Sequence, residues 1–314
     1  MTITITTGND SVTDFLAYLD TFDAAFTPAG RGTFSDGLQG DYAGAESDIT
    51  DTANPASQAY ILRGEIVYSM TTHTLSGPVS GVDLGYGATL SNGVLALDQS
   101  DYSVSFDPEI SNEDDAHDMI YGFFGMSDDG SDRSDFLAGY VKTDSIDFAG
   151  ANGDDSFKGY RFDDTLIGKR GDDMLKGGAG DDVLKGGRNS DTLKGNKGDD
   201  TLDGGNGHDT LIGGKGADTL IGGKGKDVLT GGKGRDTFVF EDNIGKDKIT
   251  DFTSGRDSLD FSNFDGEATS FDEFLSAAVE RGKKVVYDFG DDGDNLIVLL
   301  DTSLDDLSAN DFIF

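Results

Sequence analysis

Residues 168–203 read GKRGDDMLK-GGAGDDVLK-GGRNSDTLK-GNKGDDTLD, four nine-residue units in direct succession. Each unit starts with Gly, carries Asp at its sixth position and Leu at its eighth. The same phase continues in both directions, so that ten units run from residue 150 to residue 239. A fixed period of this kind predicts a repetitive fold in which each unit stacks on others of its kind.

Every unit contains one acid and one large apolar residue at fixed positions. The sixth-position acids are Asp155, Asp164, Asp173, Asp182, Asp191, Asp200, Asp209, Asp218, Asp227 and Asp236. The eighth-position residues are Phe157, Leu166, Leu175, Leu184, Leu193, Leu202, Leu211, Leu220, Leu229 and Phe238. Carboxylate oxygens are hard ligands that suit Ca²⁺, which takes several oxygen ligands. We therefore expect the aspartates to be metal ligands and the apolar side chains to form the core, alternating with outward-facing neighbours.

The first six positions of a unit predict a sharp turn that brings backbone carbonyls close to an ion. Gly adopts positive φ at no steric cost and Asn is the next best residue, so Asn189 and Asn196 are expected to replace Gly. The last three positions predict a very short strand. In the calcium-bound roll that this unit resembles, each unit is half a turn; the resemblance implies an ion between a unit and the second one after it, and ten units then offer eight such gaps. The unit at 159–167, where Tyr160 and Phe162 replace glycines, is the least suited to hold one.

This pattern resembles the RTX repeat, the GGxGxDxUx unit of calcium-bound rolls. The resemblance implies an all-β parallel β-roll over 150–239 that folds on binding Ca²⁺. A flexible Gly-rich linker is the alternative interpretation. It accounts for the glycines but not for the phased Asp and Leu residues.

The composition of the 314-residue chain excludes several classes of protein. It has no cysteine, so disulfides and thiolate metal sites are excluded. Its formal net charge of −36 disfavours nucleic acid, which would be repelled. This charge divides into −21 over 1–149, −2 over 150–239 and −13 over 240–314. The repeats are thus nearly neutral between two acidic flanks, and bound calcium would make them positive.

Three segments are expected from these differences: a domain at 1–149, the repeats at 150–239 and a cap with an export signal at 240–314. The stretch 236–264 resembles the cap that follows RTX repeats in secreted bacterial enzymes. Its apolar residues are expected to cover the open end of the roll: Phe238, Val239, Phe240, Ile249, Phe252, Leu259 and Phe261.

The chain is expected to work outside the cell. No apolar run is long enough to span a membrane, and the N-terminal MTITITTGND lacks the basic and apolar regions of a signal peptide. The last residues, Asp311-Phe312-Ile313-Phe314, resemble the C-terminal signal of substrates of the type I (ABC) secretion machinery. The resemblance implies export of the unfolded chain and folding on calcium outside.

Residues 1–149 are predicted to form an α+β domain, an antiparallel sheet with helices packed on one face. Strands are expected over 2–6, 60–70, 82–90, 94–97 and 102–106, and helices over 12–26, 111–123 and 132–141. The chain has no HExxH, which excludes the zinc proteases of that motif, and no GxSxG, which disfavours lipases. A glycosidase that uses only carboxylates stays open, although no pair of acids is distinguished.

The segment YILRGEIVYSMTTHTLSGPVSGVDLGYG (60–87), with DFLAYLDTFDAAF (14–26) and AHDMIYGFFG (116–125), resembles the HasA-type haemophores. The resemblance covers most of 1–149 and implies that Tyr68 ligates the iron of haem b, with His73 bonded to the phenol oxygen. An unperturbed phenol is mostly protonated at neutral pH, so an acceptor for its proton would free the phenolate for ferric iron. Candidates to line the haem plane are Phe34, Leu38, Met70, Leu75, Leu84 and Met126.

The chain departs from the haemophores in two ways. Many members carry a second iron ligand, a histidine, in the loop after the first helix, whereas 27–44 contains none and Thr27 falls at that place. The loop between Tyr68 and His73 is also shorter than in the family. We interpret His117 as a packed structural residue and His208, at a variable repeat position, as an exposed side chain.

The leading hypothesis is a secreted, calcium-dependent haemophore that captures haem and delivers it to an outer-membrane receptor. It would be a binding protein rather than an enzyme. The alternative is an RTX surface, matrix or adhesion protein whose N-terminal domain binds a protein or polysaccharide and no haem. Titration with haemin distinguishes these two hypotheses.

Overall fold

The computed structural model describes residues 2–7, 33–36, 39–45, 58–69, 74–76, 79–91, 94–110, 145–241, 244–264, 270–289 and 295–314. Up to residue 110 the description is of backbone strands, and from Ser145 onwards it includes side chains. The chain divides into two compact units, Met1–Ala151 and Asn152–Phe314. The helices expected over 12–26, 111–123 and 132–141 lie outside the described residues, as do His73 and His117.

The described part of the first unit is a sheet of strands in the order β2-β3-β4-β6-β7-β1-β8, with β5 paired to β4. Its strands are β1 (Thr2–Thr7), β2 (Thr33–Asp36), β3 (Gln39–Ala45), β4 (Gln58–Ser69), β5 (Thr74–Ser76), β6 (Val79–Ser91), β7 (Val94–Ile110) and β8 (Ser145–Ala149). Neighbours are antiparallel except for the parallel pair β1 and β8. The predicted antiparallel strands are therefore present, while the α+β class of the domain stays a prediction.

One prediction for this sheet is wrong. The polar residues 98–101 were expected to separate two short strands, but they continue the pairing of β7 with β6 through Gln99↔Tyr86 and Ser100↔Gly85. A register shift between Leu84 and Gly85 accompanies this stretch. The polar residues therefore lie within one strand, β7, beside an irregularity of the pairing rather than in a turn.

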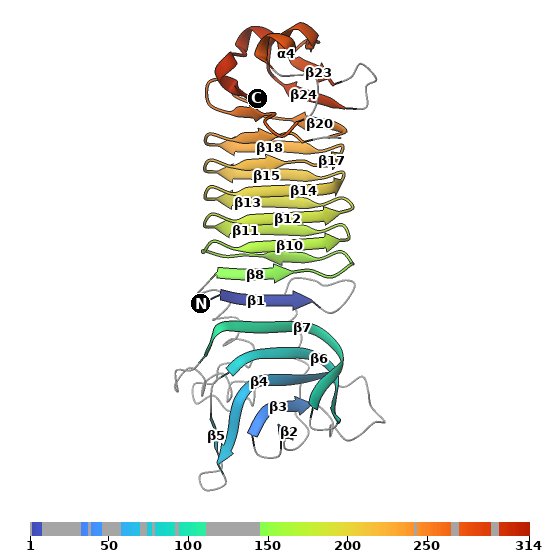
Figure 1. The fold of residues 1–314 in the computed structure, drawn as a ribbon, viewed down its shortest axis with the longest axis vertical. Coiled ribbons are helices and arrows are strands. Elements are labelled where there is room, and N and C mark those ends of the chain that lie inside the picture. Colours follow the sequence, from blue (N-terminus) through green and yellow to red (C-terminus); the bar gives the residue numbers. More distant parts are fainter. Residues whose placement is uncertain are drawn as a thin grey trace. The chain divides into compact units, whose positions relative to one another are not determined.

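The second unit begins with a parallel β-roll whose successive strands alternate between two sheets (Figure 1). The first sheet contains β10 (Thr165–Arg170), β12 (Val183–Arg188), β14 (Thr201–Gly207), β16 (Thr219–Ile221), β19 (Thr237–Val239), β21 (Ser258–Asp260) and β25 (Phe312–Ile313), with β17 (Lys224–Gly225) on β14. The second contains β9 (Ser156–Lys158), β11 (Met174–Ala179), β13 (Thr192–Lys197), β15 (Thr210–Lys215), β18 (Val228–Lys233), β20 (Lys246–Ile249) and β24 (Leu296–Leu300), then β23 (Lys284–Asp288) and β22 (Val279–Glu280). The predicted parallel β-roll is confirmed.

The eighth-position residues form the core of the roll, as predicted. Register pairs each with its counterpart one full turn later, as in Leu184↔Leu202 and Leu193↔Leu211. All ten side chains are at most 3% exposed. The same two columns continue past the repeats through Phe238↔Leu259↔Phe312 and Leu229↔Ile249↔Leu299.

Strands β9, β16 and β19 have the three residues predicted, whereas β10 to β15 and β18 are longer, with six or seven. Strand β14 pairs with β12 at the last three positions of one unit and again at the second and third positions of the next, skipping Gly186 and Gly204. Asn189 and Asn196 adopt φ of 80° and 82°, which confirms that they replace glycine in the left-handed region. Lys169 also adopts this conformation, at 83°, which its residue type did not predict.

The segment after the repeats caps the roll. Six of the seven predicted cap residues are at most 7% exposed, from Phe238 to Phe261. Val239 is only half-buried, because side chains alternate along β19 and its neighbours Phe238 and Phe240 face inwards. The rings of Phe240 and Phe261 stack at 5.1 Å, and Phe261 lies 6.3 Å from Phe274 of α4 (Phe271–Ala277). Two 3₁₀ turns, η1 (Leu304–Asp306) and η2 (Ala309–Asp311), precede β25.

Candidate metal centre

The ten sixth-position aspartates are arranged in two ladders, one beside each sheet. From Asp173 to Asp236, each carboxylate accepts the backbone N–H of the aspartate 18 residues earlier, as in Asp182 N to Asp200 Oδ1 at 2.9 Å and Asp191 N to Asp209 Oδ1 at 2.8 Å. The first ladder contains Asp164, Asp182, Asp200, Asp218 and Asp236, and the second contains Asp155, Asp173, Asp191, Asp209 and Asp227. The side chains are at most 2% exposed, although Asp is rarely buried without a partner.

The second oxygen of most of these carboxylates has no hydrogen bond. Among the described residues this holds for Oδ2 of Asp173, Asp182, Asp191, Asp200, Asp209, Asp218, Asp227 and Asp236. A Cβ added to Gly204 would lie 2.6 Å from Asp209 Oδ2 and 2.7 Å from the carbonyl oxygen of Gly222, one turn further along. A carboxylate oxygen and a backbone carbonyl of the next turn therefore converge on the space beside a glycine.

These oxygens fit a calcium ion. Within the described part of the chain, no three His, Asp or Glu side chains converge as a metal cluster. Ca²⁺ accepts carbonyl and carboxylate oxygens together. A buried carboxylate oxygen without a partner is costly, and a divalent cation in this space would remove the cost.

The unit with Tyr160 and Phe162 differs from the others. The backbone N–H of Tyr160 donates to Asp164 Oδ2 at 3.1 Å. This oxygen is therefore engaged within its own unit. That this unit is the least suited to hold an ion stays a prediction.

Burial raises the pKa of eight ladder carboxyls, from Asp173 to Asp236, above the ordinary value of 3.8. The pKa rises to about 7 for Asp173, Asp182, Asp191 and Asp218, and to about 6 for Asp200 and Asp209. Desolvation is the main cause, the backbone N–H donor of the preceding turn opposes it, and neighbouring carboxylates add to it.

Acidification of the metal-free protein is expected to favour the folded roll. An acid whose pKa is raised in the folded state stabilises that state below the unfolded pKa, and this contribution is lost as the pH rises through about 6 to 7. The far-UV circular dichroism of metal-free protein should therefore gain β signal between pH 8 and pH 5. Calcium-loaded protein should not change over this range. A metal-free spectrum that is constant or loses β signal on acidification contradicts the prediction.

A separate column of fifth-position side chains lies on the outside of the turns. Fifth-position acids accept the backbone N–H of the fifth position one turn later, as in Asp199 N to Asp181 Oδ1 at 2.7 Å. His208 is exposed, as predicted, and its Nδ1 takes this role for the N–H of Lys226 at 3.1 Å. These groups are bonded to backbone, which distinguishes them from the sixth-position oxygens.

Two aspartates of the ladders were missed in the sequence. Asp227 N donates to Asp247 Oδ1 at 3.1 Å and Asp236 N donates to Asp257 Oδ1 at 3.2 Å. The segments Gly245-Lys-Asp-Lys-Ile249 and Gly255-Arg-Asp-Ser-Leu259 keep the G-x-D-x-U part of the motif, and both glycines have positive φ. Asp247 follows Asp236 by 11 residues and Asp257 follows Asp247 by 10 residues, so a search for a period of nine does not find them. A search for the G-x-D-x-U part of the motif, without a fixed period, would have found both aspartates.

Tyr68 lies near the end of β4, in a part of the chain described by its backbone. It pairs with Leu75 of β5, and Ser69 pairs with Thr74. Val67 pairs with Gln39 at the start of β3, and Gln39 pairs with Asp36 of β2. The end of β2 and the start of β3 therefore lie at the same end of the sheet as the end of β4 and the start of β5.

The candidate haem-lining residues do not all share this end of the sheet. Leu75 pairs with Tyr68 itself. Phe34 pairs with Tyr42, which pairs with Leu62, six residues before Tyr68 on β4. Leu84 pairs with Tyr60, which precedes Tyr68 by eight residues on β4, or roughly 26 Å along the strand. Leu38, Met70 and Met126 lie outside the described residues.

Four stretches of the chain match the family of the RTX calcium-binding nonapeptide repeat: 149–184, 176–211, 185–220 and 203–238. The chain therefore carries calcium-binding repeats of this class over the part that forms the roll. No curated protein matches the sequence. No helix in the described ranges is long and apolar enough to cross a membrane.

Three solved structures illustrate the similarity. Extracellular lipase LipA from Serratia marcescens is 21% identical over 54% of this chain, which spans 40% of the lipase's length, with a TM-score of 0.32. The holo hemophore HasA from Yersinia pestis is 20% identical over 45% of this chain and 88% of its own, with a TM-score of 0.33. The AlgE6R3 subunit of the Azotobacter vinelandii mannuronan C5-epimerase is 24% identical over 53% of this chain and 81% of its own, with a TM-score of 0.21. All three TM-scores are too low to assign a function.

Proposed function

We propose that this protein is a secreted, calcium-dependent haemophore whose RTX repeats fold on Ca²⁺ and whose N-terminal domain, 1–149, binds haem at Tyr68. The calcium part rests on the eight buried carboxylate oxygens without a hydrogen bond in the described residues. Each ion would lie between two turns of the roll, held by the sixth-position aspartates from Asp155 to Asp236 and by carbonyls of the glycine turns. A divalent cation there neutralises the ladder.

Export before folding is part of the proposal. Asp311 is 1% exposed and Phe312 is 8% exposed, and both are built into the end of the roll. The Asp311 carboxylate accepts the N–H of Gly255 and the hydroxyl of Ser254, each at 2.7 Å. Type I machinery that reads the segment from Asp311 to Phe314 in 240–314 must therefore read it on an unfolded chain. Calcium outside the cell would then drive folding.

The haem part rests on the position of Tyr68. The register places it one residue before the end of β4, beside the four-residue connection 70–73 that leads into β5. His73 is the last residue of that connection and precedes Thr74 directly. A phenol one residue before the end of a strand, with a histidine five residues later in the sequence, suits a ferric iron ligand with a proton acceptor. The bound haem would then be passed to an outer-membrane receptor, and the protein would perform no catalysis.

Replacement of Tyr68 by Phe is expected to abolish the ferric haem spectrum of the complex. The change removes only the phenolic oxygen, so it tests ligation rather than packing. Haemin is titrated into calcium-loaded wild type, Tyr68→Phe and Tyr60→Phe, and the visible spectrum is recorded. Wild type and Tyr60→Phe should show the same phenolate-ligated ferric species, with at least about tenfold weaker binding in Tyr68→Phe.

Two results would overturn the haem proposal. One is a wild-type titration that gives only the spectrum of free haemin, which would favour an RTX surface or adhesion protein. The other is a Tyr68→Phe variant with the wild-type spectrum, which would place the ligand elsewhere.

A further inference from the structure

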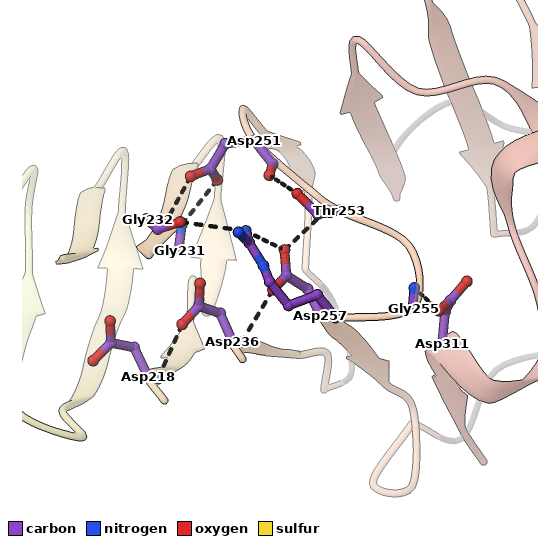
Figure 2. Close-up of polar contacts among 10 residues, drawn as sticks. Asp218, Gly231, Gly232, Asp236, Asp251, Thr253, Gly255, Asp257 and Asp311 are labelled. Atoms are coloured by element: carbon purple, nitrogen blue, oxygen red, sulfur yellow. Dashed lines mark hydrogen bonds and ion pairs between the residues drawn. The ribbon is translucent and has the colours of Figure 1, made fainter. Parts of the chain in front are cut away.

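The first ladder ends at Asp257, whose carboxylate is fully engaged. Its Oδ1 accepts the backbone N–H of Asp236 at 3.2 Å and its Oδ2 accepts that of Thr253 at 2.9 Å (Figure 2). The guanidinium of Arg256 donates from Nε to Oδ1 at 3.0 Å and from Nη2 to Oδ2 at 3.1 Å. Asp257 is 2% exposed, like the carboxylates of the inner turns.

Arg256 also contacts the preceding turn of the roll. Its Nη2 donates to the carbonyl oxygen of Gly232 at 3.3 Å. Gly232 is the second residue of the repeat that contains Asp236. The guanidinium therefore joins a ladder carboxylate of one turn to a glycine carbonyl of the neighbouring turn. These are the two kinds of oxygen that converge beside Gly204 within the repeats.

The last glycine turn of the repeats is held by the cap in a further way. The Asp251 carboxylate accepts the N–H of Gly231 at 2.9 Å and that of Gly232 at 2.8 Å (Figure 2). With the contacts of Arg256 and Asp257, three cap side chains satisfy backbone groups of residues 231–236. Asp251 and Asp257 therefore accept backbone N–H groups as the ladder carboxylates do, and Arg256 supplies at this end the positive charge that calcium is proposed to supply between the inner turns.

The second ladder ends differently. Asp247 accepts the N–H of Asp227 and is 1% exposed. The residue before it, Lys246, holds the motif position of Arg256 but is exposed to solvent. The two ends of the same roll thus provide an internal comparison.

We propose that Arg256 is a built-in cation of the roll, which closes the first ladder at Asp257 in place of a calcium ion. The proposal rests on calcium binding by the inner turns. A guanidinium is suited to this role because its planar fork stays protonated and pairs with both carboxylate oxygens. Asp257, unlike Asp236 and the inner aspartates, then needs no metal, and it offers an ordered end on which the remaining turns stack when calcium binds.

Hydrogen exchange of the full chain tests this inference. Backbone exchange is followed by mass spectrometry in EGTA and in saturating calcium, for wild type, Arg256→Gln and Arg235→Gln. Arg235 holds the same motif position one turn earlier and is exposed, which makes it the matched control. The informative amides are those of Asp236 and Thr253, which donate to Asp257, and that of Asp227, which donates to Asp247.

In EGTA the amides of Asp236 and Thr253 should stay protected in wild type and in Arg235→Gln, and exchange about tenfold faster or more in Arg256→Gln. In calcium all three proteins should protect them, which shows that the variant still folds. The Asp227 amide should be protected only in calcium. The inference is overturned if wild type loses protection of the Asp236 and Thr253 amides in EGTA, or if Arg256→Gln matches wild type there. Failure of calcium binding itself would differ, because the amides of 155–227 would then exchange alike in calcium and in EGTA.

Discussion

Removal of calcium is expected to unfold the repeats from residue 155 to residue 227. Each unit of nine residues buries only one large apolar side chain, so the core is small for the length of chain that it must order. At pH 8 the six carboxyls of Asp173, Asp182, Asp191, Asp200, Asp209 and Asp218, with a pKa of about 6 to 7, are ionised in a roll that buries them. Without a cation, each turn therefore places another uncompensated charge in the stack. The folded roll should not persist under these conditions.

Far-UV circular dichroism at pH 8 measures this effect. Protein in EGTA should lose most of the β signal of the repeats and regain it cooperatively on titration with calcium. Mg²⁺ at the same concentration should restore much less, because it requires shorter, strictly octahedral coordination and gives up its water reluctantly. A spectrum in EGTA that equals the calcium-loaded spectrum would contradict the calcium assignment.

The sequence predicted those parts of the roll that depend on phase. An Asp and an apolar residue repeated every nine positions predict two stacked columns, and the burial of Asp200 and Leu202 confirms both. Register follows directly, because only one alignment places every large residue inside. The two columns and the two ladders required no knowledge of long-range contacts.

Features that depend on a change of phase were not predicted. Asp247 follows Asp236 by 11 residues and Asp257 follows Asp247 by 10 residues, so the period of nine ends at Val239. Their place in the ladders is fixed by tertiary pairing of β20 and β21 with the repeats. The bonds of Arg256 to Asp257 and Gly232 depend on the fold of the turn 253–257 and are likewise absent from any pattern. In the first unit, alternation predicted the strands, but the polar residues 98–101 concealed the continuity of β7.

Replacement of Gly198 by Ala is expected to destabilise the calcium-loaded roll by roughly 2–4 kcal/mol, from left-handed strain and overpacking together. Gly198 adopts φ of +120°, and a Cβ there would overlap the carbonyl oxygen of Gly180, which lies one full turn of the roll earlier. That carbonyl belongs to a glycine turn of the candidate calcium sites. The added methyl group must therefore separate two turns and is expected also to raise the calcium concentration needed for folding.

Gly282→Ala provides the control for backbone strain alone. Gly282 also has positive φ, at +71°, but a Cβ there would meet no atom within 4 Å. Its replacement should cost only the left-handed strain, about 1 kcal/mol. Urea unfolding of both variants in saturating calcium, followed by circular dichroism, separates the two contributions. Equal shifts of the two unfolding midpoints would show that the turns of the roll are not packed closely enough to require glycine at position 198. A much larger shift for Gly198→Ala would show that contact between turns, rather than φ alone, selects glycine there.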